Sequence, residues 1–367
     1  MTGSSAIDLS VHVSASDAEA RELLNDAWDE LVRAQVRPNP TLLSGWLAAM
    51  LMRDQGLFTV VRVEHERRLV AAAALSMYRP LGPAGPTFAR WPGDPTMWFD
   101  PDILIRPDNH EAGGTLVRAI VQRTHALYVP CFADSALSRT LRGWDTRALH
   151  RWPPADGWVA PIPLPRDAYM RRRIGQDMRQ AQRKGAQTEV RIATSRSDID
   201  VALERMFALH HAYWETRPDY IRRFSATEEL RALNRRAVLA LADSTESFVA
   251  EVVENGEVVA ARIGLLAGHG LVAHTSATRR HTILKEPGYA CLLAQIDHGA
   301  SRGATVVDLG PGAGGPGTVK GRAGAIHVPI DRVMCARSPG LLRACLSLVR
   351  TRDRSQEVLR RLRRARA

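Results

Sequence analysis

Residues 247–309 give the strongest indication of a fold in this sequence. Three strand-like runs follow one another there, and a helical pattern and a further strand-like run come after them: 247–254, 257–266, 271–277, 288–302 and 305–309. Asn255 and Gly256 separate the first two runs and predict a tight hairpin, because both residues tolerate the positive φ that such turns require. The segment is therefore predicted to form an α/β unit.

The rest of the chain continues this alternation of helices and strands. Predicted helices cover 16–35, 40–56, 111–125, 166–184, 198–216 and 226–242, and predicted strands cover 57–63, 69–77, 97–99, 126–132 and 327–336. A chain of 367 residues suggests two compact units more readily than one. The segment from Pro153 to Pro165 carries several prolines and is the predicted boundary between them.

A short internal repeat supports a duplication. The run His-Glu-Ala-Gly-Gly-Thr-Leu-Val starts at His110 and opens one predicted helix, and Lys-Glu-Pro-Gly-Tyr-Ala-Cys-Leu starts at Lys285 and opens another. Glu and Gly coincide, the apolar positions after them agree, and a strand follows each helix after a short turn. The N-terminal copy has no nearby basic residue before Arg118, so we predict that its turn is structural.

The turn at the start of the second copy is a candidate anion site. Backbone N–H groups are free at the start of a helix, and the helix dipole adds positive charge, so a pyrophosphate fits there. Gly288 would let a phosphate approach the backbone, and the small Ala290 would leave the first helical turn uncrowded. Taken alone, Lys285-x-x-Gly288-x-Ala290 fits an ordinary helix start better than a binding site.

This turn resembles the acyl-CoA pyrophosphate loop of the GNAT acyltransferase superfamily, Arg/Gln-x-x-Gly-x-Gly/Ala, with Lys285 where Arg or Gln is usual. The order of several motifs is similar to the double-domain CelD-like branch, the cellulose-biosynthesis acetyltransferases related to the Fem-type aminoacyl transferases. These motifs are Pro40–Trp46, Met97–Asp100, Arg171–Lys184, Pro287-Gly288, Val307–Gly310 and Lys320. The family often has an aromatic residue before the lysine, whereas this chain has Val319.

The resemblance implies an α/β (α+β) fold with two GNAT-like mixed-sheet domains in tandem, the N-terminal one degenerate. We expect the N-terminal domain at residues 1–160, the C-terminal catalytic domain at 161–338 and a basic helix at 339–367. The glycine-rich loop 310–317 lacks the GxxxxGK[ST] spacing of a nucleotide loop. We expect it to be a mobile loop that closes over substrate.

The resemblance also implies acyl transfer to an amine, which needs a base for the amine proton and N–H donors for the carbonyl oxygen. His274 and Asp308 are the candidate bases; a buried strand histidine and a loop-stabilising aspartate are the alternatives. Lys320 is a candidate for holding a phosphate or polarising the carbonyl, and its alternative is a surface lysine. Tyr289 is a candidate proton donor to a departing thiolate, or a core residue.

Acyl-CoA, with acetyl-CoA as the simplest case, is the expected co-substrate. Its predicted binding residues are Lys285, Gly288, Ala290, Thr275 and Arg183. Two segments carry the basicity of the chain: residues 166–191 hold eight Lys and Arg against three acids, and residues 340–367 hold nine Arg against two. The first predicts a contact with the CoA 3′-phosphate or a tRNA backbone, or a solvated helix face. The second predicts docking on an anionic membrane surface, nucleic-acid binding or a frayed terminus.

Cysteine and histidine usage fits a reducing compartment. The four cysteines lie far apart without a CxxC pair, and the histidines show no HExxH spacing, so we expect no disulfide frame and no metal. We expect a cytoplasmic protein, with peripheral attachment at the inner face of the membrane as the alternative. The leading hypothesis is an acyl-CoA-dependent N-acyltransferase acting on an amine acceptor in envelope or polysaccharide metabolism. The alternatives are a Fem-type aminoacyl-tRNA-dependent transferase and a non-catalytic binding protein.

Overall fold

The computed structural model describes residues 9–54, 56–79, 85–92, 102–214, 227–311 and 319–351. Its N-terminal half runs through the following elements: β1 Leu9–Val13, α1 Asp17–Leu23, α2 Asp26–Arg33, η1 Pro40–Leu42, α3 Ser44–Arg53, β2 Phe58–His65, β3 Arg68–Tyr78, β4 Phe88–Arg90, β5 Leu104–Ile105, α4 His110–Arg123, β6 Ala126–Phe132, α5 Ala136–Thr140, η3 Leu141–Gly143, η4 Thr146–Ala148 and β7 Leu149–Pro161.

The C-terminal half follows without interruption. Its elements are α6 Asp167–Arg183, β8 Thr188–Ala193, α7 Arg196–Trp214, α8 Glu228–Ala242, β9 Ser247–Glu254, β10 Glu257–Ala267, β11 Gly270–Thr278, α9 Pro287–Ser301, β12 Val306–Pro311, α10 Val319–Ala323 and β13 Ile326–Cys335, followed by a helix at 339–351. The strand predicted at 97–99 and most of the loop predicted at 310–317 lie outside the described residues.

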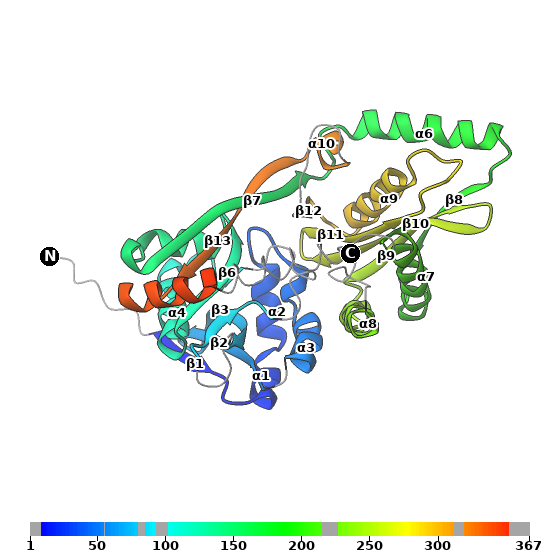
Figure 1. The fold of residues 1–367 in the computed structure, drawn as a ribbon. Helices are drawn as coiled ribbons and strands as arrows, with labels where there is room; N and C mark the ends of the chain where they lie inside the picture. The colour runs from blue at the N-terminus through cyan, green and yellow to red at the C-terminus, as the bar shows by residue number, and fades with distance from the viewer. Residues whose placement is uncertain are drawn as a thin grey trace, which may run out of the picture.

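One mixed sheet runs through both halves in the order β1-β2-β3-β4-β6-β13-β7-β12-β11-β10-β9-β8, with β5 beside β3. The long strands β7 and β13 cross from one half to the other, as Figure 1 shows. β13 pairs with β6, where Cys335 lies opposite Leu127, and also with β7. β7 in turn pairs with β12, where Val159 lies opposite Asp308.

Most of the proline-rich segment lies within a strand of this sheet. Residues 153–161 belong to β7, because an extended strand next to a partner accommodates proline where its missing N–H is not needed. The halves are therefore joined by strand pairing as well as by the chain, and the last strand of the sequence completes the sheet of the first half. The division at residue 160 stays a prediction.

The two halves share a hydrophobic core on one face of the sheet. α3 packs on α8, and one cluster of buried side chains contains Trp28 and Trp46 from the first half together with Leu203 and Val238 from the second. The Trp28 indole N–H donates to the carbonyl of Leu42 at 2.7 Å, so this large side chain is buried without losing its hydrogen bond. Burial of this shared surface favours one folding unit over two.

The opposite face is covered by separate helices. α9 and α6 cover the C-terminal half, where Met170 and Ile174 of α6 are buried. The helix at 339–351 packs on the N-terminal half through Leu342 and Cys345. The prediction of a frayed terminus is therefore wrong for 339–351, whereas 352–367 lie outside the described residues. In the described part of the chain, no helix is long and apolar enough to cross a membrane.

Local sequence accounts for most element ends. Asn255 and Gly256 have φ values of 52° and 83°, as the hairpin prediction requires, and Gly185 ends α6 with a φ of 83°. The helix predicted at 16–35 is instead two helices, α1 and α2. The side chain of Asn25 accepts a hydrogen bond from the backbone N–H of Trp28 and starts a new helix there.

Candidate functional site

The parallel strands β11 and β12 separate in the middle of the C-terminal half. Their register runs from Gly270 opposite Val306 to Val272 opposite Asp308 and ends there. Immediately beyond Val272, β11 contains a bulge, because three residue steps on β11 face two on β10. His274 and Thr275 form the bulge. Backbone groups at such a point are directed away from the regular ladder and can reach a bound group.

His274 lies on the buried side of this bulge. Its side chain is 5% exposed and packs against Trp46 of α3, with 5.3 Å between the ring centroids. Its Nδ1 lies 2.9 Å from the hydroxyl of Thr275. Both residues are thus next to the opening between β11 and β12, but His274 belongs to the shared core. The base role predicted for it stays a prediction.

Asp308 and Lys320 both contact the end of β12. One carboxylate oxygen of Asp308 accepts the backbone N–H of Gly310 at 2.6 Å. Lys320, at the start of α10, donates from Nζ to the carbonyls of Gly310 and Pro311 at 2.8 and 2.7 Å. The peptide groups of Gly310 are therefore fixed from both sides. In this structure Lys320 positions the strand end and its ammonium group is directed at protein carbonyls.

A cavity of 1280 Å³ lies between the two halves, and Asp308 is on its wall. Gly270, Val272 and Val306 line it from the second half. The first half contributes the segment 35–39, β5, the start of α4 and the turn between β6 and α5. The opening of the β11–β12 pair is therefore accessible from a space that both halves build.

Arginines line the N-terminal side of this cavity. Arg37 forms an ion pair with Asp134, and Arg106 forms one with Glu30 at 3.0 Å. Arg118 projects from the third turn of α4 and is exposed. The turn at 110–115, which the sequence predicts to be structural, thus begins a helix that lines this cavity.

Asp102 is a half-buried acid in the wall of the same cavity. Its carboxylate accepts the backbone N–H groups of Ala136 and Leu137 at 2.6 and 2.9 Å, and thereby satisfies the start of α5. Loss of hydration outweighs these hydrogen bonds and raises the pKa of Asp102 to about 6. The charge of this carboxylate therefore changes with pH in a range close to neutrality.

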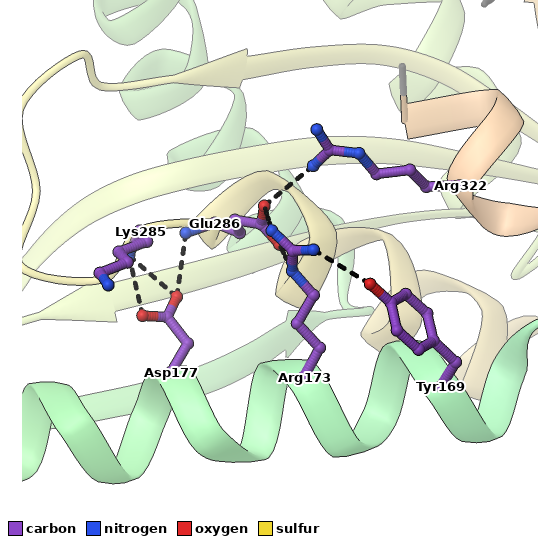
Figure 2. A network of polar contacts seen from close by, with 6 residues as sticks. All are labelled: Tyr169, Arg173, Asp177, Lys285, Glu286 and Arg322. Atoms are coloured by element: carbon purple, nitrogen blue, oxygen red, sulfur yellow. Dashed lines mark hydrogen bonds and ion pairs between the residues drawn. The ribbon is translucent and has the colours of Figure 1, made fainter. Parts of the chain in front are cut away.

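The turn before α9 has its backbone N–H groups occupied by carboxylates. Asp177 of α6 accepts the N–H of Lys285 at 2.8 and 3.1 Å and the N–H of Glu286 at 2.9 Å. Glu254, at the end of β9, accepts the N–H groups of Ile283 and Leu284 at 3.0 and 2.7 Å. Figure 2 shows Asp177 below the backbone of Lys285 and Glu286.

Arginines converge on the next carboxylate along the chain. Arg173 of α6 contacts Glu286 through two nitrogens at 2.7 and 2.5 Å, and Arg322 of α10 contacts it at 3.0 Å (Figure 2). Arg173 also donates to the hydroxyl of Tyr169 at 3.1 Å. Arg322 lies 5.7 Å from the ring centroid of Tyr289, whose burial raises the pKa of its hydroxyl. Glu286 thus ties α6 and α10 to the start of α9.

The family comparison identifies the region that holds this turn. Residues 168–315 match the acetyltransferase (GNAT) domain family, and they contain β11, the α9 turn and Asp308. The matched region lies in the C-terminal half of the chain. The comparisons support an acyltransferase kind for this protein. No curated protein matches the sequence.

Solved structures share the fold over most of the chain. The crystal structure of FemX is 11% identical, covers 88% of this chain and 96% of its own, and has a TM-score of 0.57. The C-terminal domain of a putative lysylphosphatidylglycerol synthetase from Agrobacterium fabrum is 13% identical, with coverages of 91% and 96% and a TM-score of 0.53. A conserved protein of unknown function from Bacteroides thetaiotaomicron is 10% identical, with coverages of 89% and 100% and a TM-score of 0.53.

These likenesses confirm the predicted fold class of two GNAT-like mixed-sheet domains. The predicted degeneracy of the N-terminal domain stays a prediction. Within the described ranges, no group of three or more His, Cys, Asp or Glu side chains could hold a metal. The four cysteines, all of which lie in described segments, are free and buried.

The predicted CoA-binding residues of the GNAT domain do not form one open site. Lys285 is exposed and Ala290 is buried in the first turn of α9. A Cβ on Gly288 would lie 3.3 Å from the hydroxyl of Thr278, which is closer than an ordinary contact, so a side chain there would have to displace Thr278. Arg183 is exposed at the end of α6, and Thr275 is at the bulge. The backbone N–H groups of residues 283–286 in this turn bond to Glu254 and Asp177, and the binding role of the five predicted residues stays a prediction.

Asp177 and Glu254 were not among the predicted site residues, although one of them has a sequence signature. Asp177 follows Met170 and Ile174 at intervals of four and three residues, and Ala181 is four residues further on. It therefore interrupts the apolar stripe of a predicted helix with a charge, which needs a partner when buried. Glu254 directly precedes the hairpin turn, where an acid is ordinary, so the sequence alone gave no reason to select it.

Proposed function

We propose that this protein transfers an acyl group to an amine acceptor at the point where β11 and β12 separate. The observation that carries the proposal is the coincidence of three features there: the end of the parallel register, the bulge at His274 and Thr275, and Asp308 on the wall of the cavity. Backbone N–H groups of the bulge would stabilise the negative charge that develops on the acyl oxygen. Asp308 would accept the proton of the attacking amine.

The acceptor would enter through the cavity between the halves. Its lining combines the acids Asp308 and Glu111 with the exposed guanidinium of Arg118. This distribution suits an acceptor that carries its amine at one end and an anionic group at the other. Participation in envelope or polysaccharide metabolism rests on the family resemblance alone and stays a prediction.

An aminoacyl ester of tRNA is a second candidate donor beside acyl-CoA. α6 presents an exposed cationic ridge formed by Arg172, Arg179 and Arg183, which repeat at helical spacing on one face. Other arginines of this helix have acidic partners: Arg171 pairs with Asp297, for example. A ridge of charges along a helix suits a phosphate backbone. The filled turn before α9 favours a donor that places no diphosphate there.

The test is a transfer assay on the full chain with three donor classes: acetyl-CoA, long-chain acyl-CoA and aminoacyl-tRNA. Each donor is combined with a panel of amines, and the amide product is detected by mass spectrometry. Asp308→Asn should lower the rate by about 100-fold or more, because the base is lost while the shape is kept. Asp156→Asn is the matched control, since Asp156 is on neighbouring β7 and pairs with His327. Absence of transfer from every donor would contradict the proposal and favour a binding protein.

A further inference from the structure

The start of α9 is the position at which a GNAT domain would receive a diphosphate, and the protein supplies its own anions there. The backbone N–H groups of four consecutive residues, 283–286, bond to the carboxylates of Glu254 and Asp177. Each carboxylate receives two of these N–H groups. Both acids are 9% exposed, so the bonds form in a site from which water is largely excluded.

Residues 287–290 leave few free backbone N–H groups that a ligand could bind. Pro287 has no N–H, and the N–H groups of Tyr289 and Ala290 bond to the carbonyl of Glu286 within the first turn of α9. Among residues 283–290, all of which are described, Gly288 is the position whose N–H has no bond of either kind. One N–H group does not replace the several that a diphosphate needs.

Electrostatics oppose a diphosphate at the same place. A ligand on this turn would meet the carboxylates of Asp177, Glu254 and Glu286, and like charges at short range in a poorly hydrated site repel strongly. Arg173 and Arg322 do not compensate for this repulsion, because both are already directed at Glu286. The carboxylate of Asp177 also already lies at the positive end of the α9 helix dipole.

Packing of α6 holds Asp177 in place. Ile174 and Ala181, one turn to either side of it, are buried in the core beneath α9. Rotation of the Asp177 carboxylate out of the turn would leave two N–H groups without partners, and removal of α6 would expose its apolar stripe. The acid is therefore a fixed part of the fold.

We infer that the α9 turn is an anion site closed from within by Asp177 and Glu254, and that a CoA diphosphate does not bind at Lys285–Ala290. The turn joins α6, β9 and α9, and the acyl donor engages the protein without placing a diphosphate there. The inference rests on the proposed function in one respect: it assumes that the protein has an acyl donor.

The experiment combines calorimetry with hydrogen exchange on the full chain. Inorganic pyrophosphate, CoA and acetyl-CoA are titrated separately, and exchange of the peptide covering 283–290 is followed by mass spectrometry with and without each compound. Asp177→Ala opens the turn, and Asp177→Asn is a second variant that keeps the volume. Asp167→Ala is the matched control, because it removes an acid from the first turn of the same helix, where Asp167 pairs with Arg171.

In the wild type, none of the three compounds should change exchange at 283–290. Asp177→Ala should bind pyrophosphate at least about tenfold more tightly than wild type and the control, since it frees two N–H groups and removes a repulsive charge. Protection of 283–290 by CoA in the wild type, or acetyl-CoA binding that Gly288→Glu abolishes, would overturn the inference. Equal pyrophosphate affinity in folded Asp177→Ala, Asp177→Asn and wild type would also overturn it. If the variants fail to fold, the wild-type exchange result alone decides.

These readouts separate the inference from the proposed function. Acetyl-CoA that protects the cavity and leaves 283–290 unchanged would support the inference. Failure of acyl transfer with every donor, together with an unresponsive turn, would remove the proposed function and leave the closed turn intact.

Discussion

At the scale of single residues, carboxylates that are buried or half-buried hold the main chain at both ends of the candidate site. Asp177 fills the turn before α9, Asp102 holds the start of α5 beside the cavity, and Asp308 fixes the backbone of Gly310. Each accepts backbone N–H groups, which are obligatory donors that need partners when buried. Asp102 and Asp308 line the cavity and bind the main chain at the same time.

Asp177→Ala should lower the free energy of unfolding by about 2 to 3 kcal/mol, because it removes charge-assisted hydrogen bonds and leaves two N–H groups unpaired. Asp167→Ala should cost less than about 1 kcal/mol, because its ion pair with Arg171 is partly exposed. Urea unfolding followed by circular dichroism measures both values. Equal losses in the two variants would show that the bonds to the α9 turn do not stabilise the fold.

The raised pKa of Asp102 predicts a pH dependence of stability. The native state binds the proton more readily than the unfolded chain, so protonation stabilises the fold. As the pH falls from 7 to 4, wild type should gain about 1 to 3 kcal/mol relative to Asp102→Asn, which does not titrate there. Urea unfolding of both proteins across this range measures the difference. A difference that is constant with pH would show that Asp102 has an ordinary pKa.

At the scale of elements, α6 has two faces with separate tasks. Its buried face carries Asp177 to the α9 turn, and its exposed face carries the ridge of Arg172, Arg179 and Arg183. The helical repeat places these residues on opposite sides, so that charges of opposite sign do not neutralise one another. One face of α6 therefore fills the turn before α9 with a carboxylate, and the other face presents the arginine ridge to the solvent.

Replacement of Arg172, Arg179 and Arg183 by Gln should weaken tRNA binding and reduce the dependence of log affinity on log salt by about 2 to 3. Filter binding at several salt concentrations measures the slope. The control replaces Arg21, Arg123 and Arg142, which are exposed in the N-terminal half and change the net charge equally. If both triple variants lose the same affinity, general charge and not the ridge attracts the nucleic acid.

At the scale of the whole molecule, the two GNAT-like halves behave as one structure. Strand β13 pairs with β6 of the first half, and the core beneath α3 and α8 contains side chains from both. The cavity and the opening beside Asp308 therefore depend on contacts between segments that are distant in the sequence. The first half alone lacks β13, which pairs with its strands β6 and β7. The cavity wall needs residues from both halves.

Urea should unfold the full chain in a single cooperative transition, with coincident curves from circular dichroism and tryptophan fluorescence. A chain of residues 1–160 alone should not fold stably, because β6 and β7 lose β13 and the core loses its partner side chains. Near-ultraviolet circular dichroism of the fragment provides the check. Two separate transitions in the full chain, or a folded fragment, would show independent domains.

The sequence by itself determined many of the elements, although it did not predict the strands β1, β4, β5, β7 and β8. Turn residues such as Asn255-Gly256 and Gly185 act over a few neighbours, and hydrophobic periodicity identified the strands and helices. The resemblance of several motifs to the CelD-like branch of the GNAT superfamily predicted two GNAT-like domains. Residues 168–315 match the GNAT domain family, and the FemX structure shares the fold over 88% of the chain. Where a local contact split a helix at Asn25, the capping residue was also readable in the sequence.

Only the tertiary structure decided which groups face one another. Asp177 lies 108 residues before Lys285, and no local pattern states that its carboxylate meets the N–H groups of that turn. The same holds for β13 beside β6, for His274 against Trp46, and for the cavity that Asp308 shares with the N-terminal half. Turns and periodicity are set by short-range sterics and hydrogen bonds, whereas burial, charge pairing and cavities arise from the packing of distant segments. That is why the sequence predicted an open anion site and the folded chain closes it.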